Sequence, residues 1–152
     1  MKNVALAAVF AVCAGFSATA ASAQPGSPNT TPGVVSRVNL FRINPGHFDA
    51  FWADMRQHLK PVYDEFKRRG IITDYSVATK STTESADDWD AVVTLSYKNW
   101  AALDGIGSRI DSVTLGHYGS AAQRTAAGNA RNEHRTVVKS FLAREQTVNP
   151  WK

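Results

Sequence analysis

The stretch HFDAFWADMRQHLKPVYDEFKRRG, residues 47–70, decides the fold because it has the pattern of one long amphipathic helix. Its large apolar side chains recur at spacings of three and four residues, which places them on one face of an α-helix. These side chains are Phe48, Phe51, Met55, Leu59, Val62 and Phe66, with Trp52 beside them. Gly70 follows a basic run and supplies a C-terminal stop. Because Pro61 removes one backbone hydrogen bond, we expect a single helix that bends there.

Segments rich in β-branched and aromatic residues surround this helix. We expect strands over residues 34–43, 71–80, 89–97 and 135–144. Two more helices are expected between the last two strands, one capped by Asn99 and a shorter one opened by the capping box Ser120-x-x-Gln123. The order β-α-β-β-α-(α)-β is the split βαβ arrangement. It predicts an α+β domain with a four-stranded antiparallel sheet and its helices on one face.

Both faces of the first expected strand carry large apolar residues. Val34, Val38 and Leu40 lie on one face, and Val35 and Phe41 lie on the other. Helices cover only one face, and the other would leave a contiguous apolar surface in water. A second copy of the sheet is the simplest cover, so the sequence predicts a homodimer. Which face meets the helices stays open, since a shift of one residue exchanges the two.

The first 23 residues have the plan of a cleaved secretory signal. A charged start, Met1-Lys2-Asn3, is followed by an apolar run and by the small-residue site Ala21-Ser22-Ala23. The apolar run is too short for a stable membrane anchor. We therefore expect a periplasmic or secreted protein that is cleaved after Ala23.

The remaining chain divides into three segments. Residues 24–33 are rich in proline and glycine and predict a flexible linker. Residues 34–146 predict the folded domain, and residues 147–152 a loose tail. The single cysteine, Cys13, lies in the signal, so the mature chain has no disulfide, cysteine nucleophile or thiolate metal ligand. A net charge of +4, or +3 without Lys2, is small and scattered, which argues against a nucleic-acid partner.

Over residues 34–146 the chain resembles the dimeric α+β barrel superfamily, whose protomers are ferredoxin-like. The resemblance rests on the element order and on two motifs. Asn44-Pro45-Gly46-His47-Phe48 leads into the long helix, and Tyr97-Lys98-Asn99-Trp100-Ala101-Ala102-Leu103 joins the third strand to the second helix. The chain looks most like the small, exported, uncharacterised bacterial members. The superfamily includes monooxygenases, isomerases, haem-degrading enzymes and haem peroxidases, so the resemblance implies a fold rather than one activity.

In active members of this superfamily the ligand lies between the helices and the sheet. The resemblance therefore implies a pocket lined by Asn39, Tyr97 and His117. Haem-degrading members use an Asn on the first strand, a Trp on the third and an axial His on the second main helix. Asn39 and His117 match two of these roles, which makes His117 a candidate axial ligand for haem. Tyr97 stands where the Trp is expected, which counts against oxidative haem cleavage and leaves simple haem binding open.

A different hypothesis is cofactor-free chemistry on an acidic small molecule, which needs a base and a polar anchor in a dry pocket. His58 and Trp52 belong to the long helix, and Arg37 shares a strand face with Asn39 and offers a cation. No two histidines stand at metal-ligand spacing on one helix, so we expect no metal site and no cofactor other than the haem alternative. His47, at the entry to the long helix, and His134, just before the last strand, are expected at the surface.

Three functions remain open. The chain binds or transforms a small molecule, forms a non-catalytic structural or stress-related dimer, or binds haem. A cavity lined by Asn39, Tyr97 and His117 would favour the first, and a site filled by Trp52 and Trp100 would favour the second.

Overall fold

The computed structural model describes residues 27–82, 85 and 88–151. The expected signal, residues 1–23, lies outside them, as do the first three residues of the expected linker. Within the described part of the chain, no helix has both the length and the apolar character needed to cross a membrane.

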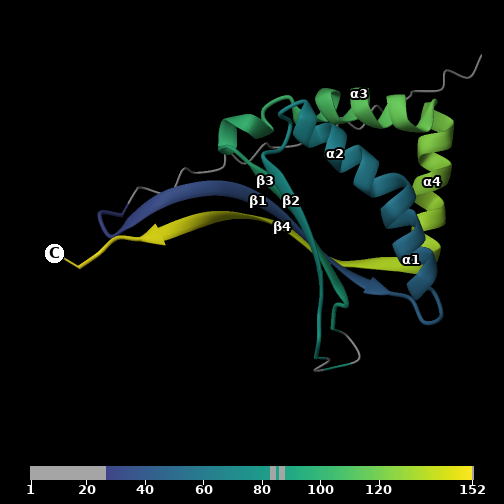
Figure 1. Ribbon diagram of the computed structural model, residues 1–152, viewed down its shortest axis with the longest axis horizontal. Helices are drawn as coiled ribbons and strands as arrows, with labels where there is room; N and C mark the ends of the chain where they lie inside the picture. Colours follow the sequence, from purple (N-terminus) through teal and green to yellow (C-terminus); the bar gives the residue numbers. More distant parts are fainter. Residues whose placement is uncertain (1–26, 83–84, 86–87, 152) are drawn as a thin grey trace, which may run out of the picture.

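The chain has the ferredoxin-like α+β fold that the sequence predicts. An antiparallel four-stranded sheet, in the order β2-β3-β1-β4, carries the helices on one face (Figure 1). The strands are β1 (Thr30–Ile43), β2 (Asp74–Thr79), β3 (Ala91–Tyr97) and β4 (Arg135–Val148). The helical elements are α1 (Phe48–Asp54), η1 (Met55–Leu59), α2 (Lys60–Arg68), η2 (Trp100–Leu103), α3 (Ile106–Tyr118) and α4 (Ala121–His134).

The long helix is continuous but changes its winding in the middle. Between α1 and α2, the residues of η1 form a π-helical turn, in which the Lys60 amide donates to the Met55 carbonyl five residues back. Pro61 sits in the first turn of α2 and has no amide hydrogen to donate to the turn before it. The wider turn accommodates this missing bond. The bend expected at Pro61 is therefore a π-helical turn that ends just before it.

The core lies between this helix and one face of the sheet. In β3 the buried side chains alternate with half-buried ones, and Ala91, Val93, Leu95 and Tyr97 face the helices. Their partners across the ladder place Val35, Arg37, Asn39 and Phe41 of β1 on the same face. The sequence left open which face of the first strand meets the helices, and the structure shows that it is the face with Val35 and Phe41. The helix contributes its stripe to the core, namely Phe51, Met55, Leu59, Val62 and Phe66.

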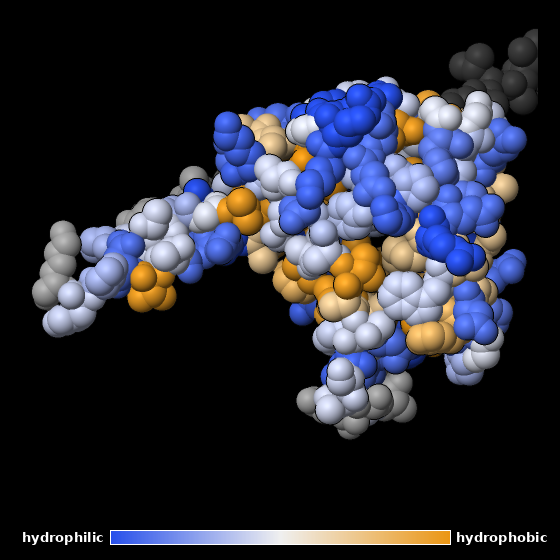
Figure 2. Space-filling model, in the orientation of Figure 1, coloured by the Kyte–Doolittle hydropathy of each residue, from blue (hydrophilic) through white to orange (hydrophobic). Residues whose placement is uncertain are grey.

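Phe48 is an exception to the predicted stripe, because 58% of its surface is exposed. It lies at the very start of α1, where the chain has only just left the sheet, and its ring packs edge-on against Trp52. In Figure 2, which has the orientation of Figure 1, hydrophilic side chains cover much of α2 and α3, and a hydrophobic area lies near the centre, below α2.

Both outer ends of the β1–β4 pair are longer than the sequence predicts. Thr30 pairs with Val148, so the last four linker residues and the first two residues of the expected tail are strand. The Asn149 amide donates to the Asn29 carbonyl at 2.8 Å and closes this end. The pairing engages backbone groups on the facing sides of both segments, apart from an irregularity between Pro32 and Val35. The two strands extend beyond the helices as an arm (Figure 1).

The two phenylalanines of α1 provide a stability test. We expect Phe51→Ala, at a site only 1% exposed, to lower the free energy of unfolding by about 3–5 kcal/mol, because it leaves a cavity in the core. Phe48→Ala is the matched control and should change it by less than about 1 kcal/mol. Urea unfolding followed by circular dichroism measures both values. Equal losses would contradict the assigned core.

Candidate functional site

The three residues expected to line one pocket have separate surroundings. The side chain of Asn39 accepts a hydrogen bond from the Ser140 hydroxyl of β4 at 2.8 Å. Tyr97 is 1% exposed and packs in the core, where burial raises the pKa of its hydroxyl. His117 lies in the last turn of α3 and is exposed. The structure therefore does not assemble the pocket that the resemblance implied.

Two further candidate residues, Trp52 of α1 and Arg37 of β1, also lie next to core residues. Trp52 is half-buried and meets the Phe51 ring edge-on, with 5.1 Å between ring centroids. Arg37 lies opposite Leu95 on the helix-facing side of β1, and its charge opposes the rise in the pKa of Tyr97.

His58 and His117 come together, although the sequence placed them in different hypotheses. The Nδ1 atom of His58 lies 3.1 Å from the Nε2 atom of His117, so one ring donates a hydrogen bond to the other. His58 reaches this position from the π-helical turn, and His117 from the end of α3. Tyr118 packs against both rings, with centroids 5.5 Å and 4.7 Å away.

A buried charged cluster lies beyond Tyr118. The Nε atom of Arg131 is 3.1 Å from each carboxylate oxygen of Asp54, and both side chains are nearly buried. A second nitrogen of Arg131 donates to the Tyr118 hydroxyl. Asp54 and Arg131 are 77 residues apart in the chain, so no local spacing in the sequence reveals this contact.

Two further side chains, those of His134 and Arg135, belong to this region. His134 was expected at the surface but is 8% exposed, because α4 lays its last residue against α1, and its Nε2 is 3.9 Å from the Asp54 carboxylate. Burial lowers the pKa of His134, and Asp54 partly opposes that effect. The Arg135 guanidinium lies over the Phe41 ring at 4.4 Å, and its buried Nη1 has no hydrogen-bond partner among the described residues.

The balance of charge in this cluster is positive. Asp54 compensates one of the two guanidinium groups, those of Arg131 and Arg135, and burial lowers the pKa of Arg135. Burial also raises the pKa of Tyr63, and the charges of both arginines act against that rise. The region is therefore electropositive and shielded from water.

This cluster forms one end of a cavity between α2, α3 and α4. Its volume is about 260 Å³. The lining residues are Leu59, Val62, Tyr63, Phe66, Ile110, Thr114, Tyr118, Arg124 and Arg131. Apolar side chains of α2 and α3 form the walls, and the tyrosines and arginines supply the polar groups. A mostly apolar cavity with a few convergent polar groups is the usual form of a small-molecule site.

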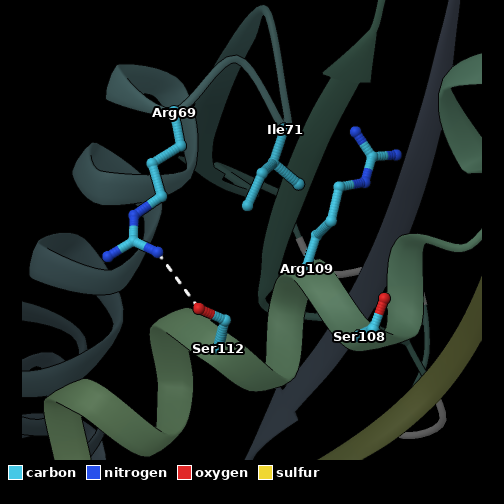
Figure 3. A pocket seen from close by; sticks show the side chains of 5 residues that line it. All are labelled: Arg69, Ile71, Ser108, Arg109 and Ser112. Atoms are coloured by element: carbon cyan, nitrogen blue, oxygen red, sulfur yellow. Dashed lines mark hydrogen bonds between the residues drawn. The ribbon is translucent and has the colours of Figure 1, made fainter.

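Two other hollows have fewer apolar side chains in their linings, and their polar groups are engaged, as those of Arg131 and Arg124 are here. In one, of about 300 Å³, Arg69 donates to Ser112 and pairs with Glu65, while Arg109 donates to the carbonyl of Ala102 (Figure 3). The other lies beside the turn into α1, where Asp90 accepts the amide of Ile43 at 2.8 Å. Among the described residues, no cluster of three or more His, Cys, Asp or Glu side chains suits a metal ion.

No protein-family model and no curated protein matches this chain. Solved structures similar to it include HapK from Hahella chejuensis, with 12% identity and a TM-score of 0.49 over 78% of this chain and 97% of that one. A dimeric ferredoxin-like protein from an uncultured marine organism has 15% identity and a TM-score of 0.47 over 80% of this chain and 100% of that one. A dimeric protein of unknown function with a ferredoxin-like fold, from Bacteroides fragilis, has 13% identity and a TM-score of 0.40 over 77% and 97%. At such low similarity, these structures do not indicate what this chain binds.

The buried histidine predicts a pH dependence of stability. An ordinary histidine has a pKa near 6.5. Below that pH the unfolded chain takes up a proton that buried His134 resists, so the free energy of unfolding should fall as the pH decreases. We expect His134→Gln to reduce this fall between about pH 7 and pH 5, measured by urea unfolding. An unchanged slope in His134→Gln would contradict the assignment.

Proposed function

We propose that this protein binds a small, largely apolar molecule with one anionic group in the cavity between α2, α3 and α4. The observation that carries the proposal is that the cavity has apolar walls and that its lining includes two guanidinium groups, those of Arg124 and Arg131, and no carboxylate among the described residues. Each guanidinium is paired with a carboxylate outside the lining, Arg131 with Asp54 and Arg124 with Asp111, and still presents donors toward the cavity for an anionic ligand. Guanidinium groups suit carboxylates because they offer parallel donors in one plane.

The size of the cavity limits the ligand. A volume of about 260 Å³ lies just below the range of about 300–1,000 Å³ that is usual for ligand pockets. A single aromatic ring with a carboxylate is of suitable size. The proposal assigns no cofactor. Haem remains the alternative for His117, and binding there would require this ring to leave His58.

We also propose that the protein is exported from the cytoplasm and that it forms a homodimer. Export rests on the signal pattern of residues 1–23. Dimerisation rests on the sheet face away from the helices, where Val38 and Phe141 lie opposite each other and Leu40 lies opposite Val92. Phe141 is 40% exposed on this face. A second sheet packed on this apolar row would remove it from water.

Three nearly isosteric probes test the binding site: benzoate, benzamide and benzamidine. Titration followed by NMR should show that the anion binds tightest and the cation weakest, because the polar end of the cavity is electropositive. Arg131→Met should weaken benzoate binding by at least about tenfold, which corresponds to about 1.4 kcal/mol. The matched control is Arg68→Met, because Arg68 is exposed on α2 and pairs with Glu65.

Equal affinity for the three probes would overturn the proposed anion site in the unmodified protein, whatever the stability of the variants. If none of the probes binds, the structural dimer gains support. A Soret band on haem addition that disappears in His117→Ala would favour the haem alternative instead.

A pair of adjacent residues on β4 tests the dimer. Phe141 and Leu142 are 40% and 41% exposed and point to opposite faces of the sheet. We expect Phe141→Asp to convert the dimer to a monomer, since it places a charge in the interface, and Leu142→Asp to leave it dimeric. Light scattering after gel filtration measures the mass. A monomeric unmodified protein, or equal dissociation of both variants, would contradict the assigned interface.

A further inference from the structure

The proposed ligand cavity makes no direct use of His58 and His117. Their rings are nearly perpendicular, at 83°, and the two facing nitrogens are 3.1 Å apart. Both nitrogens thus converge on one small region of space between η1 and α3. We refer to these two residues as the histidine pair.

The separation of the two nitrogens suits a shared metal ion. Two zinc–nitrogen bonds of about 2.0–2.1 Å at a tetrahedral angle separate their nitrogens by about 3.3–3.4 Å. The observed 3.1 Å therefore requires the rings to move apart by only a few tenths of an ångström. His58 lies in η1, which is continuous with α2, and α2 packs against α3, which carries His117.

The histidine pair is accessible and held in orientation. His117 is exposed and His58 is half-buried, so an ion reaches them from solvent. The Tyr118 ring packs against both and restricts their rotation. Burial lowers the pKa of His117, and His58 and Arg131 add to this effect. This favours the neutral ring that a metal ion requires.

We propose that the histidine pair binds one divalent transition-metal ion of the Zn²⁺, Ni²⁺ or Cu²⁺ type, with water as the remaining ligands. Imidazole nitrogens favour these ions over Mg²⁺ and Ca²⁺. The ion replaces the hydrogen bond between the rings, and the proton of the donating nitrogen moves, by exchange with solvent, to the other nitrogen of the same ring, so that each ring stays neutral. The site is distinct from the cavity for the anionic ligand, so the two proposals stand or fall separately.

Isothermal titration of the full chain with Ni²⁺ and with Zn²⁺ tests the site. We expect one ion per chain and an affinity that weakens as the pH falls, because protonation of the rings competes with the ion. His58→Gln and His117→Gln should each weaken binding by at least about tenfold, because each removes one of two protein ligands. His47→Gln alters an exposed histidine at the start of α1, and it should bind Ni²⁺ and Zn²⁺ with the affinity of the unmodified chain.

Mg²⁺ should give no binding heat at the same concentrations. No binding of Ni²⁺ or Zn²⁺ at about 1 mM would overturn the proposal, because the affinity would then be weaker than about −4 kcal/mol. Unchanged affinity in His117→Gln would also overturn it. That variant lies on the surface at the end of α3, so its folding is readily checked by circular dichroism.

Discussion

The ion pair between Asp54 and Arg131 is the contact on which the arrangement of the helices depends. It joins the end of α1 to α4, and its two side chains are only 11% and 13% exposed. A buried pair is costly to form and still costlier to break, because loss of one partner leaves the other charge without compensation. Tyr118, which accepts a hydrogen bond from Arg131, extends the same contact to the end of α3. The Arg131 guanidinium of α4 thus contacts a side chain at the end of α1 and another at the end of α3, and links the three helices.

The same contact determines the chemistry of the cavity. Asp54 neutralises one arginine, while Arg135 lies against the Phe41 ring with a buried nitrogen that lacks a partner in the described structure. The cavity combines an apolar lining from η1, α2 and α3 with the guanidinium groups of Arg124 and Arg131 from α4. An aromatic acid is complementary to both parts. The histidine pair lies on the other side of Tyr118, so one tyrosine separates two regions of different chemistry.

The fold could be predicted from local patterns, and the candidate site could not. The apolar spacing of α1 and α2, the cap at Ser120 and the alternation in β3 are local signals, and all three were confirmed apart from the exposed Phe48. The site depends on contacts between residues far apart in the chain, such as His58 with His117, 59 residues away. His134, just before the last strand, was expected at the surface, whereas the docking of α4 on α1 buries it. The π-helical turn had a local cause in Pro61, but its effect on the direction of His58 emerges only in the folded chain.

A double-mutant cycle on Asp54 and Arg131 tests the central role of the ion pair most directly. The free energy of unfolding would be measured for the unmodified chain, Asp54→Asn, Arg131→Met and the double variant. Each single variant should lose about 3–5 kcal/mol, and the double variant should lose less than their sum by about 2 kcal/mol. Losses that add to within about 0.5 kcal/mol would show that the two side chains act independently, and would contradict this view of the helix layer.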